Sequence, residues 1–463
     1  MSLPGATADG PDLSRPRRIH LVGVGGAGMS AYGLVLAAMG HHVSGSDLKG
    51  SPALDRLQAA GVEVFVGHRP AQVAGADLVA ASSAVPADNP ELVAARQAGA
   101  AVVSRADLLA AVASLRRCLA VAGTHGKTTT TSTTALILVE AGLHPSFVIG
   151  GDVNEIGTNA VWDTGRWLVV EADESDGTFL RLAPDIAVVT NVEADHLDHY
   201  GDFDTLRRAF ARFCREAATV VVGADDAEAA ALGRTVGAEL VGAGEEATTR
   251  IVDLQAGRDG VRFALRRGEG EVGRFTLPVP GAHNARNAAV AAVAAVAAGA
   301  SWEAAQRALA RFAGVARRFE FRGEAGGVRF VDDYAHLPAE VAATVAAARG
   351  GGWGRIVAVF QPHRYSRTAA VGADFGPALA GADVVVVTDV YPAGETPVPG
   401  VTGRLVADAV RAADPAVDVH YVASRAAVAG TVSRLLRPGD LCLTLGAGDL
   451  TSLADELLAA PTW

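Results

Sequence analysis

The chain has 463 residues, half of which are hydrophobic, and it carries a formal net charge of −11. This length suggests about three domains, and the hydrophobic content argues against a disordered protein. The acidic balance disfavours binding to nucleic acid or to an anionic membrane, because both require a basic protein surface.

The cysteines and the apolar segments favour a protein of the cell interior. Three scattered cysteines, Cys118, Cys214 and Cys442, form neither a CxxC pair nor a disulfide framework, as is usual in a reducing compartment. Residues 1–18 lack the apolar region of a secretory signal. The apolar run 288–300 is short and rich in alanine, so we expect a buried helix there. A cytoplasmic protein without membrane insertion is predicted.

The first predicted elements are a strand, a glycine turn and a helix. An apolar strand at residues 19–24 leads into Gly23-Val-Gly-Gly-Ala-Gly28, and a helical pattern runs from Met29 to Met39. The turn fits GxGxxG, with Asp47 about 20 residues further on, as in diphosphate-binding loops. Helix–strand packing without a ligand is the alternative. We predict a Rossmann-like domain over residues 1–115.

A second glycine loop follows the next apolar strand, Cys118 to Ala122. The loop Gly123-Thr-His-Gly-Lys-Thr128 leads into a helix. Such loops turn backbone N–H groups and a helix N-terminus toward a phosphate, while the lysine reaches the terminal phosphates and the threonine hydroxyl coordinates Mg2+. The pattern is shorter than a full Walker A motif, because Val121 stands where that motif has glycine. A glycine-rich helix start without ligand is the alternative.

Lysine usage supports a phosphate-binding role for this loop. Of the 40 basic residues, only Lys49 and Lys127 are lysines. A compact ammonium group suits a position beside a phosphate.

Two acidic segments follow apolar strands in this second part of the chain. They are Glu171-Ala-Asp-Glu-Ser-Asp176 and Asn191-Val-Glu-Ala-Asp-His-Leu-Asp198. Carboxylates at strand carboxyl ends suit Mg2+ beside a phosphate loop, and a neutral imidazole such as His196 can ligate a metal. We choose Glu171 as the metal ligand, because it lies closest to the apolar strand; a solvated acidic loop is the alternative.

With antiparallel strands at 251–280, a P-loop ATPase-like domain with a mixed sheet is predicted over residues 116–316.

The third part of the chain again alternates strands and helices, which predicts a second Rossmann-like domain over residues 317–463 and an α/β fold overall. Asp332-Asp-Tyr-Ala-His336 and Gln361-Pro-His-Arg-Tyr-Ser-Arg367 both follow predicted strands. The second segment offers a basic cluster that suits a carboxylate or phosphate, with a solvated surface cluster as the alternative. Just before this domain, His283, Asn284 and Asn287 begin a helix, where they either contact a nucleotide or cap the helix.

In this order, the motifs resemble those of the Mur ligase family of peptidoglycan synthesis. The matching segments run from Gly23 to Asp449 and read GVGGAGMSA, GTHGKTTT, GGDVNEIGTNA, EADESDGTF, NVEADHLDHYG, GAHNARNAA, GVARRFE, DDYAH, FQPHRYSRT, DVYPAGE and LGAGD. They are most similar to the branch that joins L-alanine to the lactyl carboxylate of UDP-N-acetylmuramate. The resemblance implies ATP and Mg2+, or Mn2+, as cofactors, an acyl-phosphate intermediate, and a monomer or weak homodimer.

The resemblance also implies a role for individual residues. UDP-sugar binding would fall to Gly25, Gly26, Ala27, Gly28, Met29, Ser30, Asp47, His68, Ser82, Ser83 and Asn159. ATP binding would fall to Gly123, Thr124, His125, Gly126, Lys127, Thr128, Thr129, His283, Asn284, Asn287, Arg318, Asp333 and Tyr334. The metal ligands would be Thr128, Glu171 and His196. The residues on the side of the incoming amino acid would be His363, Arg364 and Arg367. The catalytic set would be Lys127, Glu171, His196, His336 and Arg364, with His336 as the candidate base.

Two features of the sequence differ from what is found in members of the family. Leu337 stands where the family has a second histidine, which puts the contact at that position in doubt. With only Lys49 and Lys127 present, no lysine is left for the carbamylated lysine of several sister ligases.

Three other functions account for part of these motifs. A sibling ligase that attaches a preformed peptide to the same sugar nucleotide shares most of the motifs. A nicotinamide-dependent dehydrogenase explains only the first glycine loop, and a nonenzymatic nucleotide-binding regulator does not explain the two acidic segments.

Overall fold

The computed structural model of the chain describes residues 10–82, 84–154 and 156–459, and these form two compact units. Unit 1 comprises the residues up to Val252 together with Ala264–Gly273 and Arg286–Leu309. Unit 2 comprises Asp253–Phe263, Arg274–Ala285 and the residues from Ala310 onward. The domain boundaries at 115/116 and 316/317 stay predictions.

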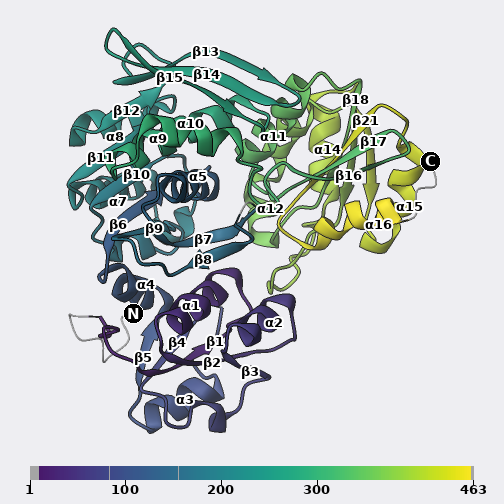
Figure 1. Cartoon of the computed structure of the whole chain (residues 1–463). Coiled ribbons are helices and arrows are strands. Elements are labelled where there is room, and N and C mark those ends of the chain that lie inside the picture. Colours follow the sequence, from purple (N-terminus) through teal and green to yellow (C-terminus); the bar gives the residue numbers. More distant parts are fainter. Residues whose placement is uncertain (1–9, 83, 155, 460–463) are drawn as a thin grey trace. The chain divides into compact units, whose positions relative to one another are not determined.

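The first sheet has five strands, all parallel, in the order β3-β2-β1-β4-β5 (Figure 1). The strand order reverses between β1 and β4, which is where open α/β sheets place a ligand crevice at their carboxyl edge. The predicted Rossmann-like fold is confirmed. Its elements are β1 (Arg18–Val22), α1 (Ala27–Ala38), β2 (His42–Asp47), α2 (Pro52–Ala59), β3 (Glu63–Val66), the 3-10 helix η1 (Pro70–Val73), β4 (Leu78–Ala81), α3 (Pro90–Gln97), β5 (Ala101–Ser104) and α4 (Arg105–Ala113).

The second sheet has ten strands in the order β15-β14-β13-β12-β11-β10-β6-β9-β7-β8. It is mixed, as predicted, because β6 lies parallel to β9 and β10 whereas β7 and β8 are antiparallel. The strands are β6 (Arg117–Ala122), β7 (Ser146–Val153), β8 (Thr158–Val161), β9 (Trp167–Glu171), β10 (Ile186–Val189), β11 (Thr219–Gly223), β12 (Glu239–Gly242), β13 (Thr249–Gly257), β14 (Gly260–Arg267) and β15 (Gly270–Leu277). The helices are α5 (Lys127–Glu140), η2 (Thr178–Arg181), α6 (Leu197–Tyr200), α7 (Phe203–Arg215), α8 (Ala227–Val236), α9 (Ala282–Ala297) and α10 (Trp302–Ala310).

The third sheet has six strands in the order β16-β17-β21-β18-β19-β20 (Figure 1). Only β16 is antiparallel to its neighbour. The strands are β16 (Glu320–Ala325), β17 (Val328–Asp333), β18 (Arg355–Phe360), β19 (Val384–Thr388), β20 (Asp418–Val422) and β21 (Asp440–Leu445). The helices are α11 (Pro338–Gly350), α12 (Tyr365–Val371), η3 (Gly372–Asp374), α13 (Phe375–Leu379), α14 (Arg404–Ala413), α15 (Arg425–Leu435), η4 (Asp449–Ser452) and α16 (Leu453–Ala459).

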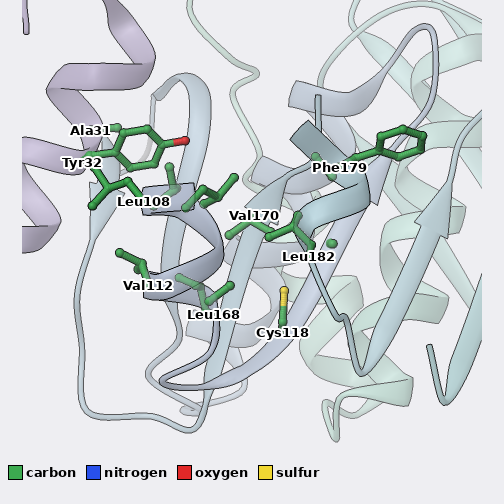
Figure 2. Packing of buried hydrophobic residues seen from close by; sticks show 14 of the residues in the cluster. Ala31, Tyr32, Leu108, Val112, Cys118, Leu168, Val170, Phe179 and Leu182 are labelled. Carbon is green, nitrogen blue, oxygen red and sulfur yellow. The ribbon is translucent and has the colours of Figure 1, made fainter. Parts of the chain in front are cut away.

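Within unit 1, the first and second sheets share a hydrophobic cluster. Leu108 and Val112 of α4 belong to the same buried cluster as Tyr32 of α1, Cys118 of β6 and Leu168 of β9 (Figure 2). None of these side chains is more than 4% exposed. Burying a large apolar side chain contributes about 1.5–3 kcal/mol, so α4 is firmly anchored to both sheets.

The alanine-rich run 288–300 lies in a buried helix, as predicted. Most of this run lies in α9, where Val290, Ala291 and Val293 are at most 3% exposed. Across the described ranges, no helix combines the length and the apolar character that crossing a bilayer demands.

Candidate active site

The second glycine loop has the strand–loop–helix geometry that the sequence predicts. The buried strand β6 delivers the chain to Gly123, and α5 begins at Lys127. Gly123 and Gly126 have φ angles of 134° and 77°, which favour glycine. A Cβ atom at Gly123 would lie 2.0 Å from Oγ1 of Thr190, and one at Gly126 would lie 2.6 Å from Oδ1 of Asn287. Asn287 therefore packs directly against this loop.

The start of the second acidic segment holds the loop in shape. Asn191 Oδ1 accepts a hydrogen bond of 2.8 Å from His125 N, and Asn191 Nδ2 donates one of 3.0 Å to His125 O. The Thr190 hydroxyl also donates to His125 O, at 2.5 Å. His125 Nε2 lies 3.2 Å from a Glu193 carboxylate oxygen. The loop is thus fixed by the protein before any phosphate binds.

The Lys127 ammonium lies inside the loop and is paired with a carboxylate. Its Nζ donates to Gly123 O at 2.7 Å and lies 2.8 Å from Oε1 of Glu174. The two side chains are only 15% and 2% exposed. Although burial lowers the pKa of Lys127, the carboxylates of Glu174 and Asp173 outweigh it and raise the pKa above its usual value. Lys127 is therefore charged, as phosphate binding requires.

Glu174 is the acidic residue that pairs with Lys127, a contact that the sequence does not predict. Glu171, the predicted metal ligand, accepts a hydrogen bond of 2.9 Å at its Oε2 from Gly150 N. After the strand the chain turns, and this turn brings Glu174 back toward Lys127. The signal available in the sequence was only that both residues belong to one acidic segment. The role of Glu171 as a metal ligand stays a prediction.

His196 lies next to this ion pair. It adopts a left-handed backbone conformation with φ of 54°, uncommon for a residue other than glycine. Its Nε2 lies 3.3 Å from Oδ2 of Asp195 and 4.0 Å from Oε1 of Glu174. The structure therefore brings Lys127, Glu174 and His196 together.

The donors around the loop fit Mg2+ that is held jointly with phosphates. Among the described residues, no group of three or more His, Cys, Asp or Glu side chains is placed to hold a metal ion by itself. However, Glu174 Oε2 and Asp195 Oδ2 are buried, and within the described part of the chain neither oxygen accepts a hydrogen bond. Thr128 lies in the first turn of α5, directly after Lys127. Mg2+ prefers oxygen donors and commonly takes one or two carboxylates together with phosphates and water.

The first glycine loop is built around a carboxylate. Oδ2 of Asp47 accepts a hydrogen bond of 2.8 Å from Gly25 N, and a Cβ atom at Gly25 would lie 2.8 Å from the same oxygen. Asp47 thus holds the loop itself, although it stands where a dinucleotide enzyme has its ribose-binding acid. Helix α1 has Gly26 as its N-cap and no side-chain cap, which leaves its N-terminus suited to a diphosphate.

The other residues proposed for the UDP-sugar are placed as follows. Met29 and Ser30 are buried, with Met29 in the hydrophobic cluster, and their contact with a ligand stays a prediction. The Ser82 side chain lies against the position of a Cβ at Gly23. Asn159, buried in β8, donates from Nδ2 to Ile149 O at 3.3 Å. Ser83 lies outside the described residues.

In unit 2, Asp333 organises the residues proposed for the nucleotide. Its two carboxylate oxygens accept hydrogen bonds from Phe319 N at 2.8 Å and Ala335 N at 2.7 Å. Burial raises the pKa of Asp333 to about 6. The ring of Tyr334 lies under two guanidinium groups, 4.8 Å from that of Arg317 and 5.3 Å from that of Arg318.

The predicted basic cluster of unit 2 is built around two histidines. The rings of His336 and His363 are 5.8 Å apart, His363 stacks on Tyr391, and Arg367 lies 3.3 Å from His363 Nδ1. Burial lowers the pKa of both imidazoles to about 4, and the neighbouring Arg367 adds to the effect. Both rings are therefore neutral at pH 7. Arg364, with φ of 70°, is the N-cap of α12.

His283 and Asn284 lie at the start of α9. Asn284 Nδ2 donates to Pro280 O at 2.7 Å, and His283 lies against Gly281. These contacts fit the helix-start interpretation; nucleotide contacts stay a prediction for both residues.

Three protein-family models match the chain. They are described as "Mur ligase family, catalytic domain" at residues 18–117, "Mur ligase middle domain" at 121–295 and "Mur ligase, glutamate ligase domain" at 317–448.

Curated relatives and solved structures agree with the family models. The chain is 49% identical to UDP-N-acetylmuramate–L-alanine ligase of Kineococcus radiotolerans, over 98% of both chains. It is 47% identical to the enzyme of that name from Saccharopolyspora erythraea, over 96% of this chain and 93% of that one. A solved structure of UDP-N-acetylmuramate-alanine ligase from Thermotoga maritima is 29% identical with a TM-score of 0.83, covering 96% of this chain and 98% of that one.

Proposed function

The chain belongs to the Mur ligase family, and from this premise we propose that it joins L-alanine to the lactyl carboxylate of UDP-N-acetylmuramate at the expense of ATP. This reaction is a step of peptidoglycan precursor synthesis. The observation that carries the proposal is the charged Lys127, held at 2.8 Å by the buried Glu174 inside a glycine loop. Two relatives named UDP-N-acetylmuramate–L-alanine ligase support it, because they are 49% and 47% identical to this chain over nearly its full length.

The reaction needs an activated carboxylate, because a free carboxylate has no adequate leaving group. Transfer of the terminal phosphoryl group of ATP to the lactyl carboxylate gives an acyl phosphate and releases ADP. The amine of L-alanine then attacks the carbonyl carbon, and the tetrahedral oxyanion collapses to the amide and inorganic phosphate. Such phosphoryl transfer depends mainly on positioning and on electrostatic stabilisation.

The residues of the second glycine loop are suited to this step. The backbone of the loop would hold the phosphates, and Lys127 would offset the charge on the transferring group. Glu174 keeps Lys127 oriented and charged when no phosphate is present. Mg2+, or Mn2+ in its place, would be held by Thr128, Glu171 and His196 as the proposed ligands, and it would offset the negative charge of the phosphates.

His336 is a weak candidate for the final acceptor of the alanine proton. An α-amino group has a pKa near 8, whereas the pKa of His336 is lowered to about 4 by burial. The neutral imidazole can accept a hydrogen bond from the amine, but it holds a proton poorly at pH 7. We therefore propose that His336, with His363, Arg364 and Arg367, serves the amino-acid side by binding and orientation.

The proposed substrates also bear on where the enzyme works. ATP and a nucleotide sugar are metabolites of the cytoplasm, which supports a cytoplasmic location.

The test is phosphate release from ATP with Mg2+ and UDP-N-acetylmuramate, comparing L-alanine with the tripeptide L-Ala-γ-D-Glu-meso-diaminopimelate. We expect release that depends on L-alanine, with the amide product confirmed by mass spectrometry. Release only with the tripeptide would assign the chain to the sibling reaction. Release with neither acceptor would overturn the proposal.

A further inference from the structure

A fully buried carboxylate of helix α3 contacts residues of the first sheet, outside the loops described above. Glu91, in the first turn of α3, has no exposed surface, and neither does His20 on β1. Oε2 of Glu91 accepts a hydrogen bond of 2.6 Å from Ser46 Oγ and lies 2.8 Å from His68 Nδ1. Oε1 lies 3.5 Å from His20 Nε2. Ser44 completes the cluster, 2.8 Å from Nδ1 of His20.

Glu91 is ionised in this environment. Burial raises the pKa of Glu91, but the neighbouring His20, Ser46 and His68 outweigh burial and hold the pKa below its usual value. A buried charge of this kind gives little net stability, because well-packed apolar residues are often equal or better in the same place. Its presence in a domain core therefore points to a use other than stability.

The cluster lies at the ligand-facing edge of the sheet. Ser46 is next in the chain to Asp47, whose side chain holds the first glycine loop through Gly25 N. The carbonyl of Asp47 accepts a hydrogen bond of 2.7 Å from Gly67 N, immediately before His68. His68 thus shares the carboxyl edge of the strands with the loop, at the ends of β2 and β3. A diphosphate on the loop would place its nucleoside along this edge.

His68 is the member of the cluster that can reach a ligand. Its side chain is 12% exposed, whereas those of His20 and Glu91 are fully buried. Its Nδ1 is occupied by Glu91, and within the described part of the chain Nε2 has no hydrogen-bond partner. Two large apolar side chains flank the same strand ends in exposed positions: Leu48 at 72% and Val66 at 58% exposure.

We propose that Glu91 is a positioning residue for the sugar nucleotide. By accepting the Nδ1 proton of His68, Glu91 fixes the orientation and tautomer of the ring, so that Nε2 is presented to the nucleoside part of the ligand. The inference rests on the proposed function, since the ligand is UDP-N-acetylmuramate. Glu91 itself does not contact the ligand.

The test is Glu91→Gln, which keeps the shape of the side chain and removes its charge. We expect the KM for UDP-N-acetylmuramate, and the Kd for UDP measured by calorimetry, to rise about tenfold, the effect of weakening a charge-assisted hydrogen bond. The KM for ATP and kcat should stay within about twofold of the wild-type values. His68→Ala should give the same rise, and the double variant should add nothing, because both changes act through one contact.

The matched control is Leu92→Ala on the same helix. Leu92 is 4% exposed and packs into a separate apolar cluster with Val22 and Val79. We expect Leu92→Ala to lower Tm and to leave the ratio of the KM for UDP-N-acetylmuramate to the KM for ATP unchanged. If Glu91→Gln does not fold, Ser46→Ala removes one hydrogen bond to the same carboxylate and a 3.0 Å contact with His68 Nδ1, and it should raise the Kd for UDP by a smaller factor.

Two outcomes would overturn the inference: an unchanged Kd for UDP in Glu91→Gln, or additive effects in the double variant with His68. Failure of the proposed function is a separate result, because it would be seen as wild-type protein that releases no phosphate with UDP-N-acetylmuramate and L-alanine.

Discussion

The two glycine loops of unit 1 share a strand–loop–helix backbone, but the charged side chain that contacts each loop has the opposite sign. In both cases a parallel strand runs into a loop with positive-φ glycine, at Gly23 in the first loop and at Gly123 and Gly126 in the second, and then into a helix. In the first loop, the Asp47 carboxylate accepts the N–H of Gly25. In the second loop, the Lys127 ammonium donates to the carbonyl of Gly123 and pairs with Glu174.

This difference separates binding from chemistry. A carboxylate that fixes backbone N–H groups helps to preorganise a loop, and it contributes nothing to phosphoryl transfer because its charge repels phosphate. An ammonium group attracts the transferring phosphate and offsets its charge. We therefore expect changes in the first loop to act on the KM for the sugar nucleotide and changes in the second loop to act on kcat.

The largest expected effect is that of Lys127→Ala. We expect kcat to fall by about 10²-fold or more, because a preorganised charge donor is lost. Lys49→Ala is the matched control: it removes the only other lysine, which is exposed, and should leave turnover unchanged. Phosphate release at saturating substrates measures both. Wild-type turnover in Lys127→Ala would remove the distinction between the loops.

Glu174→Gln should have the next largest effect. The variant leaves Lys127 in a buried position without its ion pair, so the ammonium loses orientation and its pKa falls. We expect kcat to fall by about 10- to 10²-fold, with a pH–rate profile that changes at high pH as Lys127 loses its proton. A profile that matches the wild type, with normal kcat, would show that Glu174 only fills space.

In the first loop, Asp47→Ala should raise KM and spare kcat. The variant leaves Gly25 N without its acceptor, and we expect the KM for UDP-N-acetylmuramate to rise about tenfold. Asp55→Ala, an exposed carboxylate on the neighbouring α2, controls for the loss of negative charge. Steady-state kinetics with ATP held at saturation gives both constants. A fall in kcat with unchanged KM would contradict the division of roles.

The smallest expected effect concerns the stability of the fold at acidic pH. His336 and His363 of unit 2 cause this effect, and the two glycine loops do not. Folding lowers the pKa of each imidazole from 6.5 to about 4, so the unfolded chain binds more protons between these values. Stability should therefore rise with pH across this window. Asp333, with its pKa raised to about 6, acts in the opposite direction.

The measurement is Tm between pH 4.5 and 7 for the wild type and for His363→Asn. Between pH 4.5 and 7, the Tm of the variant should change by roughly 2–4 °C less than the Tm of the wild type. The contribution of Asp333 is the same in both proteins. Identical pH profiles would show that His363 titrates normally in the folded chain.

Much of the fold was predictable because it follows from short-range patterns. The strand–glycine–helix units around Gly23 and Gly123, the alternation of strands and helices, and the buried α9 were all predicted and are confirmed. These features depend on hydrophobic periodicity and on glycine, which local sequence carries.

The site was predictable only as a set of segments. Which carboxylate meets Lys127 depends on the turn after β9, and sequence patterns do not specify the path of that turn, so the pairing with Glu174 was not predicted. Asp47 had the right spacing for a ribose ligand, yet its side chain turns to the loop. The Glu91 cluster joins four segments that lie up to 71 residues apart, from His20 to Glu91, and no local pattern reveals such a contact.

The hydrophobic cluster that α4 shares with α1, β6 and β9 makes the first sheet a poor candidate for exchange as a free-standing module. Separating it from the second sheet would expose Leu108 and Val112, at a cost of about 1.5–3 kcal/mol for each side chain. The two sheets should therefore melt together in a single cooperative transition. Recombination between relatives would conserve function best when both sheets come from the same parent.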